Sequence, residues 1–204
     1  MSSIITAHGH KLCAVDTETT GLDYKKHDII QIAIVPLDLH LRPDKNFLPF
    51  NIHLKPARPE NAEPKALKVN RKNLSDLINE GIDPFQAADL LEEWFEKLKL
   101  PVNRKIAIIG QNYCFDKAFI IEWLGPLTYE YMFDYHYRDT MITAQYLNDR
   151  AAVHGNPPPF SSGVSLTRIA RKLNIEPEGA HDALTDCLLV AECYRLMMRE
   201  FVGG

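Results

Sequence analysis

The sequence predicts an α/β fold, in which helices pack against a sheet. Apolar, β-branched segments are concentrated in the first quarter of the chain, helical periodicity dominates afterwards, and one further apolar strand lies among the helices. A chain of 204 residues is typical of one domain, so we expect a single domain over residues 1–204.

Four strands follow from the apolar pattern. Residues 11–15 form a short apolar segment, residues 29–37 a longer one rich in isoleucine and valine, and residues 47–54 a third. Proline, asparagine and glycine between these segments are typical of turns. Residues 106–109 are all apolar and predict a buried strand within the helical part.

Two helices are expected in the middle of the chain. Apolar residues at helical spacing predict a helix over residues 84–98. A second helix should begin at Asn112, because asparagine is a favourable N-cap residue. Gly125 and Pro126 should end it.

Three more helices are expected in the last third. Residues 139–150 are predicted to be helical up to the loop of consecutive prolines at 157–159. Ser165 should cap a short helix. The region from about residue 181 to residue 201 predicts a long final helix.

Composition restricts the class of protein. No apolar segment approaches the ~20 residues that cross a bilayer, and the first residues lack the basic start and apolar core of a secretory signal. We therefore expect a cytoplasmic protein that does not contact a membrane. The four cysteines form no C-x-x-C pair and are expected to act as small apolar residues without a disulfide: Cys13, Cys114, Cys187 and Cys193.

The formal net charge of −4 argues against one kind of nucleic-acid binding. Proteins that coat nucleic acid by bulk electrostatics rely on many contacts between basic side chains and phosphates. An enzyme that grips a short stretch of strand locally is still compatible with this charge. Acidic residues gathered in a metal site would also contribute to it.

The sharpest local feature is the segment DTETTGL at residues 16–22. Side chains two apart on a strand point to the same face, so Asp16 and Glu18 should project together. Two adjacent carboxylates repel each other unless a cation lies between them. A polar strand end is the alternative, but Asp16 ends an otherwise apolar strand. The turn that follows would let the backbone approach a ligand closely at Gly21.

Two further segments carry polar residues at the starts of predicted helices. Asn112 and Asp116 follow the strand at residues 106–109, and the alternative is helix capping and interaction with the helix dipole. His181 and Asp186 precede the long final helix. Capping is again the alternative, since Asp182 is an equally suitable capping residue.

Together the three segments resemble the DEDDh exonucleases, the histidine-containing branch of the DnaQ-like DEDD superfamily. The matching patterns are D-x-E-T-T-G-L, N-x-x-F-D and H-x-A-x-x-D, in that order over nearly the whole chain. The resemblance implies a ribonuclease H-like mixed sheet of about five strands flanked by helices, with the third strand closing an antiparallel meander.

The resemblance also implies a role for each acidic residue. Asp16 would bridge two Mg²⁺ or Mn²⁺ ions, Glu18 and Asp186 would complete one metal site, and Asp116 would serve the other. His181 would be the general base. Hard carboxylate oxygens suit these ions, two ions can promote in-line attack on phosphorus, and histidine can accept a proton near neutral pH.

Substrate-binding positions follow from the same resemblance. Thr19 and Leu22 correspond to positions that touch the terminal nucleotide, with Leu22 suited to wedging against its base. Asn70 ends a segment that resembles a substrate-contacting helix, although the family pattern often has His-Gly where this chain has Asn70 and Arg71. Asn112 completes the set of substrate-binding candidates.

Basic residues after position 64 could also contact substrate. They could grip strand phosphates, or they could form a solvated helix face. These residues are Lys65, Lys68, Arg71 and Lys72.

The expected function is a free-standing 3′→5′ exonuclease that releases nucleoside monophosphates, with DNA slightly favoured over RNA. Its partner would be nucleic acid with a free 3′ end. A homodimer is possible, and a polymerase partner is not expected because the chain ends shortly after the final helix. The alternatives are an inactive nucleic-acid-binding module of the same fold and a metal phosphohydrolase that acts on nucleotides.

Overall fold

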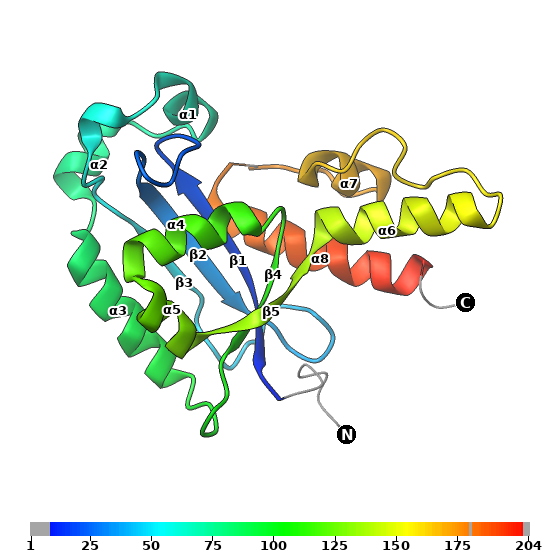
Figure 1. Cartoon of the computed structure of the whole chain (residues 1–204), viewed down its shortest axis with the longest axis horizontal. Coiled ribbons are helices and arrows are strands. Elements are labelled where there is room, and N and C mark those ends of the chain that lie inside the picture. Colours follow the sequence, from blue (N-terminus) through cyan, green and yellow to red (C-terminus); the bar gives the residue numbers. More distant parts are fainter. Residues whose placement is uncertain (1–8, 180, 202–204) are drawn as a thin grey trace.

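The computed structural model describes residues 9–179 and 181–201 and shows a five-stranded mixed sheet flanked by helices (Figure 1). The predicted fold class is confirmed. The strand order is β3-β2-β1-β4-β5. The strands are β1 Lys11–Thr19, β2 Ile29–Pro36, β3 Phe50–His53, β4 Ile106–Gly110 and β5 Phe133–Asp139.

The sheet combines an antiparallel meander with a parallel half. β1 pairs antiparallel with β2, which pairs antiparallel with β3, as expected. On its other side β1 pairs parallel with β4, and β4 pairs parallel with β5. β1 continues to Thr19, beyond the expected end at residue 15, because the ladder with β2 continues through Asp16 opposite Ala33 and Glu18 opposite Gln31. Two of the four predicted metal ligands, Asp16 and Glu18, therefore lie on a strand held by this ladder.

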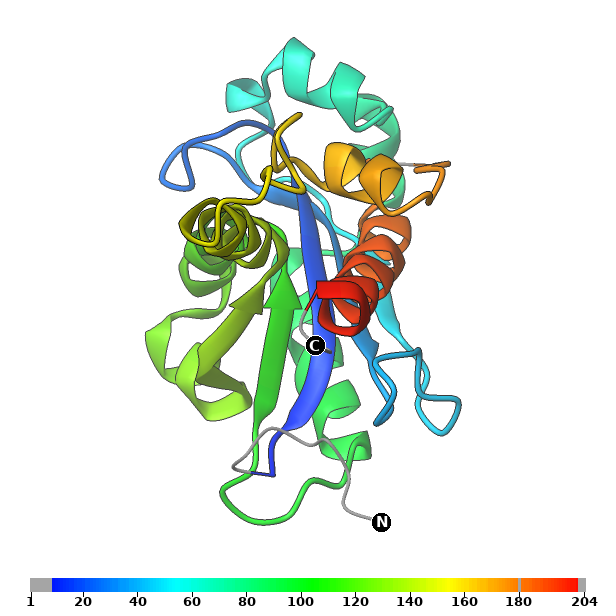
Figure 2. The ribbon, with the colours of Figure 1, turned by 90° about the vertical axis from the view of Figure 1, so that its right-hand side faces the viewer.

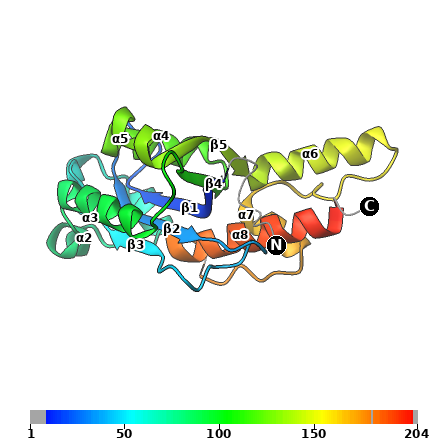
Figure 3. The ribbon, with the colours of Figure 1, turned by 90° about the horizontal axis from the view of Figure 1, so that it is seen from below.

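Helices cover both faces of the sheet. α3, α4 and α5 pack on one face and α8 packs on the other, while α6 and α7 pack beside α8 (Figures 2 and 3). The helices are η1 Pro59–Asn61, α1 Pro64–Val69, α2 Leu74–Glu80, α3 Pro84–Lys97, α4 Cys114–Leu124, α5 Pro126–Met132, α6 Thr140–Val153, α7 Leu166–Lys172 and α8 Ala183–Phe201.

Alternation along β1 gives the two faces different cores. Cys13 and Val15 face α3, α4 and α5, where large side chains such as Phe119 fill the space. Leu12 and Ala14 face α8, which meets the sheet through small residues. The small residues at this contact are Ala33 and Ala107 from the strands and Ala183, Cys187 and Ala191 from the helix. They allow α8 to lie close to the central strand.

Several helix starts follow the capping rules. The side chain of Asp83 accepts hydrogen bonds from the backbone N–H groups of Phe85 and Gln86 at the start of α3. Ser165 occupies the N-cap position of α7 as expected, but its side chain makes no capping hydrogen bond. α8 begins at Ala183, slightly later than the predicted start, and Asp182 accepts from the backbone N–H of Thr185.

The prediction that Asn112 caps α4 is wrong. Asn112 lies before the helix with φ of 55°, and Tyr113 occupies the N-cap position. The carboxylate of Asp139 accepts instead from the backbone N–H groups of Asn112 (3.1 Å) and Tyr113 (2.8 Å). It also accepts from Met141 N–H (2.8 Å) at the start of α6. One buried aspartate on β5 therefore serves the N-termini of two helices.

The sequence did not predict β5, α2 or α5. β5 is an edge strand, and Tyr135, His136 and Tyr137 are all exposed, so it lacks the apolar alternation that marks a strand. Gly125, with φ of 79°, ends α4 as predicted. Pro126 then occupies the first turn of α5, a position that suits proline.

Three of the four cysteines behave as expected. Cys13, Cys187 and Cys193 are buried free thiols, whereas Cys114 is exposed, contrary to the expectation of an apolar setting. Within the described residues, no helix is long and apolar enough to cross a membrane. Residues 1–8, which belong to the segment without a secretory signal, lie outside the described part of the chain.

Candidate active site

Three carboxylates converge at the end of β1. Asp16 and Glu18 project from the face of β1 that α8 covers, as the two-residue spacing predicts, and Asp186 comes from the first turn of α8. One oxygen from each of the three side chains lies within 4.8 Å of the others. Asp16, Glu18 and Asp186 thus form a group that could hold a metal ion.

Burial and mutual repulsion make these carboxylates hard to ionise together. Burial raises the pKa of Glu18 to about 8, and the negative charge of Asp186 adds to this effect. Burial also raises the pKa of Asp16 well above its usual range, with further contributions from Asp116, Asp186 and Glu18. A cation bound between the carboxylates would offset both burial and repulsion, because it stabilises the ionised forms.

Asp186 offers a free ligand atom. Its Oδ1 is buried and has no hydrogen-bond partner within the described residues, which is costly for a carboxylate oxygen. Its Oδ2 accepts from the backbone N–H of His181 at 3.1 Å. An orphaned buried oxygen next to two more carboxylates fits a hard divalent cation, for which carboxylate oxygens are suitable ligands.

Asp116, the fourth predicted ligand, reaches the site from α4. Its Oδ1 accepts from the backbone N–H of Thr17 (2.9 Å) and from the Thr17 hydroxyl (2.6 Å). Burial raises the pKa of Asp116 to about 7, and the Thr17 hydrogen bonds oppose the rise. Asp116 is outside the three-carboxylate group, yet its charge is the largest neighbouring contribution to the raised pKa of Asp16.

Thr17 was missed by the sequence reasoning although a signal existed. It lies between Asp16 and Glu18 on β1 and so points to the opposite face, towards α4. Because α4 also carries Asp116, the alternation could have indicated the contact. Knowing that α4 packs on that face required the tertiary structure.

His181 lies at the edge of the site. It is exposed, and it immediately precedes Asp182 and the first turn of α8. Its backbone has φ of 70°, in the left-handed region that residues other than glycine rarely adopt. Its hydrogen bond to Asp186 Oδ2 places the histidine beside a predicted metal ligand.

The predicted substrate residues in and beside the turn after β1 differ in exposure. Leu22 is 78% exposed. Thr19 is buried; its hydroxyl donates to the Gly21 carbonyl at 2.7 Å, and its own carbonyl accepts from Asn70 Nδ2 at 3.0 Å. Thr19 and Asn70 therefore shape the turn from inside, whereas Leu22 is available to a ligand.

Gly21 is needed for packing inside the protein, and the expected close approach of a ligand there stays a prediction. A Cβ atom at this position would lie 2.5 Å from the His27 imidazole. The imidazole packs under the turn and its Nδ1 accepts from the backbone N–H of Asp23 at 3.0 Å. Gly21 makes room for His27, which holds the turn in place.

The remaining predicted contacts come from other segments of the chain. Asn112 is exposed at the start of α4, and its side-chain oxygen accepts from the Cys114 thiol. Lys65, Lys68 and Arg71 are exposed. The side chain of Lys72 is only 17% exposed and lies beside acidic residues of the site.

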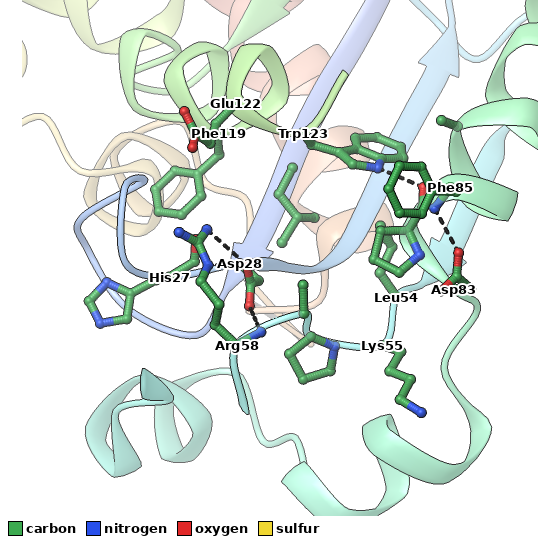
Figure 4. Close-up of a pocket in the computed structure, with 15 residues that line it drawn as sticks. His27, Asp28, Leu54, Lys55, Arg58, Asp83, Phe85, Phe119, Glu122 and Trp123 are labelled. Carbon is green, nitrogen blue, oxygen red and sulfur yellow. Dashed lines mark hydrogen bonds and ion pairs between the residues drawn. The ribbon is translucent and has the colours of Figure 1, made fainter. Parts of the chain in front are cut away.

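A separate pocket of about 430 Å³ lies between α3, α4 and the segment after β3. Figure 4 shows Phe85 and Trp123 at one end and Arg58 against Asp28 at the other. The Arg58 guanidinium is occupied by Asp28 and by the backbone carbonyl of His27. The lining holds three carboxylates, Asp28, Asp83 and Glu122, against two cations, Lys55 and Arg58. This charge balance does not favour a phosphate-bearing ligand.

Comparison with known families identifies the family of the chain. The family RNase_T, described as an exonuclease, matches residues 13–194, a range that includes all four carboxylates and His181. The chain belongs to this exonuclease family. The resemblance to exonucleases found in the sequence is confirmed, and the protein is an enzyme of the exonuclease class.

Individual relatives are similar to the chain at modest identity. A 3′-5′ DNA exonuclease, Cap18 of Escherichia coli, is 27% identical over 90% of this chain and 89% of its own length. Ribonuclease T of Haemophilus influenzae is 24% identical over 52% of this chain and 48% of its own length.

Solved structures support the ribonuclease H-like fold. Exonuclease I of Escherichia coli with a dT13 oligonucleotide has a TM-score of 0.73 at 20% identity, over 95% of this chain and 42% of that one. Exonuclease I of Methylocaldum szegediense has a TM-score of 0.71 at 23% identity, over 94% of this chain. The chain spans about two fifths of the length of these exonuclease I proteins.

Proposed function

We propose that this protein is a divalent-metal-dependent 3′→5′ exonuclease that removes nucleoside monophosphates from DNA ends. The observation that carries the proposal is the convergence of Asp16, Glu18 and Asp186 around a buried oxygen without a hydrogen-bond partner among the described residues. DNA is favoured over RNA because the relative that matches along 90% of the chain is named a DNA exonuclease. Ribonuclease T matches along about half of it.

Two Mg²⁺ or Mn²⁺ ions would be held by the four carboxylates. Asp16, Glu18 and Asp186 would hold one ion, and Asp116 would hold the other together with Asp16. Such a pair of ions supplies Lewis-acid activation of water and stabilisation of the leaving oxygen. The orphaned Asp186 Oδ1 is the atom best prepared to act as a ligand.

The protein's own side chains position the strand and move the proton. His181 accepts the proton of the attacking water; its exposed ring is accessible from solvent, and its backbone is fixed to Asp186. Leu22 packs against the terminal base, and Thr19 and Asn70 hold the turn that presents it. Asn112 contacts the strand from the start of α4.

The test is digestion of 5′-labelled DNA and RNA oligonucleotides in Mg²⁺, Mn²⁺ or EDTA. We expect a ladder that shortens from the 3′ end, is stronger for DNA and disappears in EDTA. Covalently closed circles should survive, because a terminal-nucleotide pocket needs a free end.

Other outcomes of this test would select the alternatives. Binding without cleavage in either metal would indicate an inactive binding module. Release of phosphate from mononucleotides without shortening of oligonucleotides would indicate a nucleotide phosphohydrolase. Efficient nicking of a closed circle would contradict an exonuclease.

A further inference from the structure

The backbone at His181 must be held by its surroundings. A non-glycine residue with φ of 70° persists only where neighbouring contacts fix it. One such contact is the hydrogen bond from His181 N–H to Asp186 Oδ2. The other contacts act through the next residue, Asp182.

Asp182 is anchored on both of its carboxylate oxygens. Oδ1 accepts from the backbone N–H (3.2 Å) and hydroxyl (3.3 Å) of Thr185 in the first turn of α8. Oδ2 accepts from Gln31 Nε2 at 3.0 Å and lies 3.7 Å from Lys72 Nζ. Gln31 is fully buried and is the ladder partner of Glu18. Strand β2, which pairs with the part of β1 that carries Asp16 and Glu18, therefore also supports Asp182.

Lys72 supplies the remaining link. Its ammonium lies between Asp182 and His53, whose Nε2 is 2.8 Å from Nζ. Its positive charge opposes the rise in the pKa of Glu18. Lys72 follows Asn70 by two residues, and Asn70 holds the carbonyl of Thr19 in the turn that presents Leu22. A continuous set of contacts thus runs from that turn to the start of α8.

We propose that Lys72 is a positioning residue of the exonuclease site, which holds His181 in place by linking the Asn70 segment to Asp182. This inference rests on the proposed function. Lys68 and Arg71 in the same region are exposed, whereas Lys72 is largely buried and already engaged with protein groups. Lys72 thus differs from the basic residues around it and acts on the protein rather than on a strand phosphate.

The experiment compares Lys72→Met with Lys45→Met, a matched removal of an exposed lysine between β2 and β3 that has no predicted substrate contact. Under single-turnover conditions, Lys72→Met should lower the cleavage rate about 10- to 100-fold with little change in KM, as is usual when support around a metal site is lost. Lys72→Arg, which keeps the charge, should restore most of the rate. Asp182→Asn should have a similar effect, and the double variant should lose less than the sum of the two.

A direct phosphate contact would give the opposite pattern. KM would rise, the rate at saturation would hold, and the salt dependence of binding would become shallower. That result overturns the proposal, as does an equal loss in Lys45→Met.

A second readout does not depend on activity. Amide hydrogen exchange at His181, followed by NMR, should accelerate in Lys72→Met and in Asp182→Asn but not in Lys45→Met. If wild-type protein cleaves no oligonucleotide, the proposed function fails while this measurement still decides the positioning role. Unchanged exchange in both folded variants would refute the positioning role even in an active enzyme.

Discussion

Two helices bring a carboxylate to the end of β1 from opposite faces of the sheet, and the two carboxylates are treated differently. On the α4 side, Asp116 Oδ1 receives two hydrogen bonds from Thr17. On the α8 side, Asp186 Oδ1 is buried without a hydrogen-bond partner among the described residues. Both pKa values are raised by burial, but only in Asp116 do side-chain and backbone donors from β1 compensate.

The difference indicates that the two carboxylates depend on a bound cation to different degrees. A carboxylate already held by Thr17 keeps a fixed geometry with or without a ligand. An orphaned oxygen is destabilising until a cation binds it. We therefore expect Asp186 to couple metal binding to stability more strongly than Asp116 does.

The largest expected effect is loss of turnover on neutralising either carboxylate. Asp186→Asn and Asp116→Asn should each lower turnover by ~10³-fold or more, because metal activation is worth several kcal/mol. In EDTA, Asp186→Asn should raise the melting temperature, since it relieves repulsion. Asp116→Asn should raise it less. Turnover is measured after chelation and readdition of Mg²⁺, and the melting temperature is measured by calorimetry in EDTA. Full activity of Asp186→Asn would show that Asp186 is not a metal ligand.

The next effect concerns His181, which is bonded to the other oxygen of Asp186. General-base assistance is typically worth 10²–10⁴-fold, so His181→Ala should lose about that much in the single-turnover rate. Metal and substrate binding should persist because no ligand is removed. His40→Ala, an exposed histidine between β2 and β3, is the control. A loss below about 10-fold would mean that His181 only marks the start of α8.

A smaller effect should follow from removing the Thr17 hydroxyl, which donates to Asp116 on the α4 side of the sheet. Thr17→Val keeps the size of the side chain and the backbone N–H but removes the hydroxyl donor to Asp116. We expect metal affinity and turnover to fall about 10-fold, the lower end for lost support of a metal ligand. Thr17→Ser should recover both. Titration calorimetry with Mn²⁺ measures the affinity, and an unchanged dissociation constant for Thr17→Val would show that the backbone N–H alone suffices.

The smallest effect is a pH dependence of stability without metal. The pKa values of Glu18 and Asp116 are raised to about 8 and about 7, so the folded state favours their protonated forms. This stabilisation is complete below the carboxyl pKa values of the unfolded chain, near ~4, and is lost as pH rises through the folded values. In EDTA the melting temperature should fall by roughly several degrees between pH 5 and pH 8.5.

Two comparisons sharpen that pH experiment. Mg²⁺ should reverse the fall, because it favours the ionised carboxylates. Glu18→Gln should flatten the curve, because it removes one of the titrating groups. A melting temperature in EDTA that rises over the same range would contradict the raised pKa values.

The sequence alone determined the class of fold, most of its elements and the convergent acids. Apolar periodicity specified four strands and most of the helices, because alternation and helical spacing are local properties of the chain. The two-residue spacing of Asp16 and Glu18 on one strand was enough to place them on one face of the sheet. Three short motifs in order indicated the exonuclease family, and the match to RNase_T confirmed it.

The tertiary structure decided how those acids are supported. β5 escaped prediction because an edge strand with exposed tyrosines has no apolar alternation, and with it the role of Asp139 at the starts of α4 and α6 was missed. The bond from Thr17 to Asp116 spans 99 residues, and the contact of Gln31 with Asp182 spans 151. Contacts of that separation depend on which elements pack together, and local propensity carries no record of the packing.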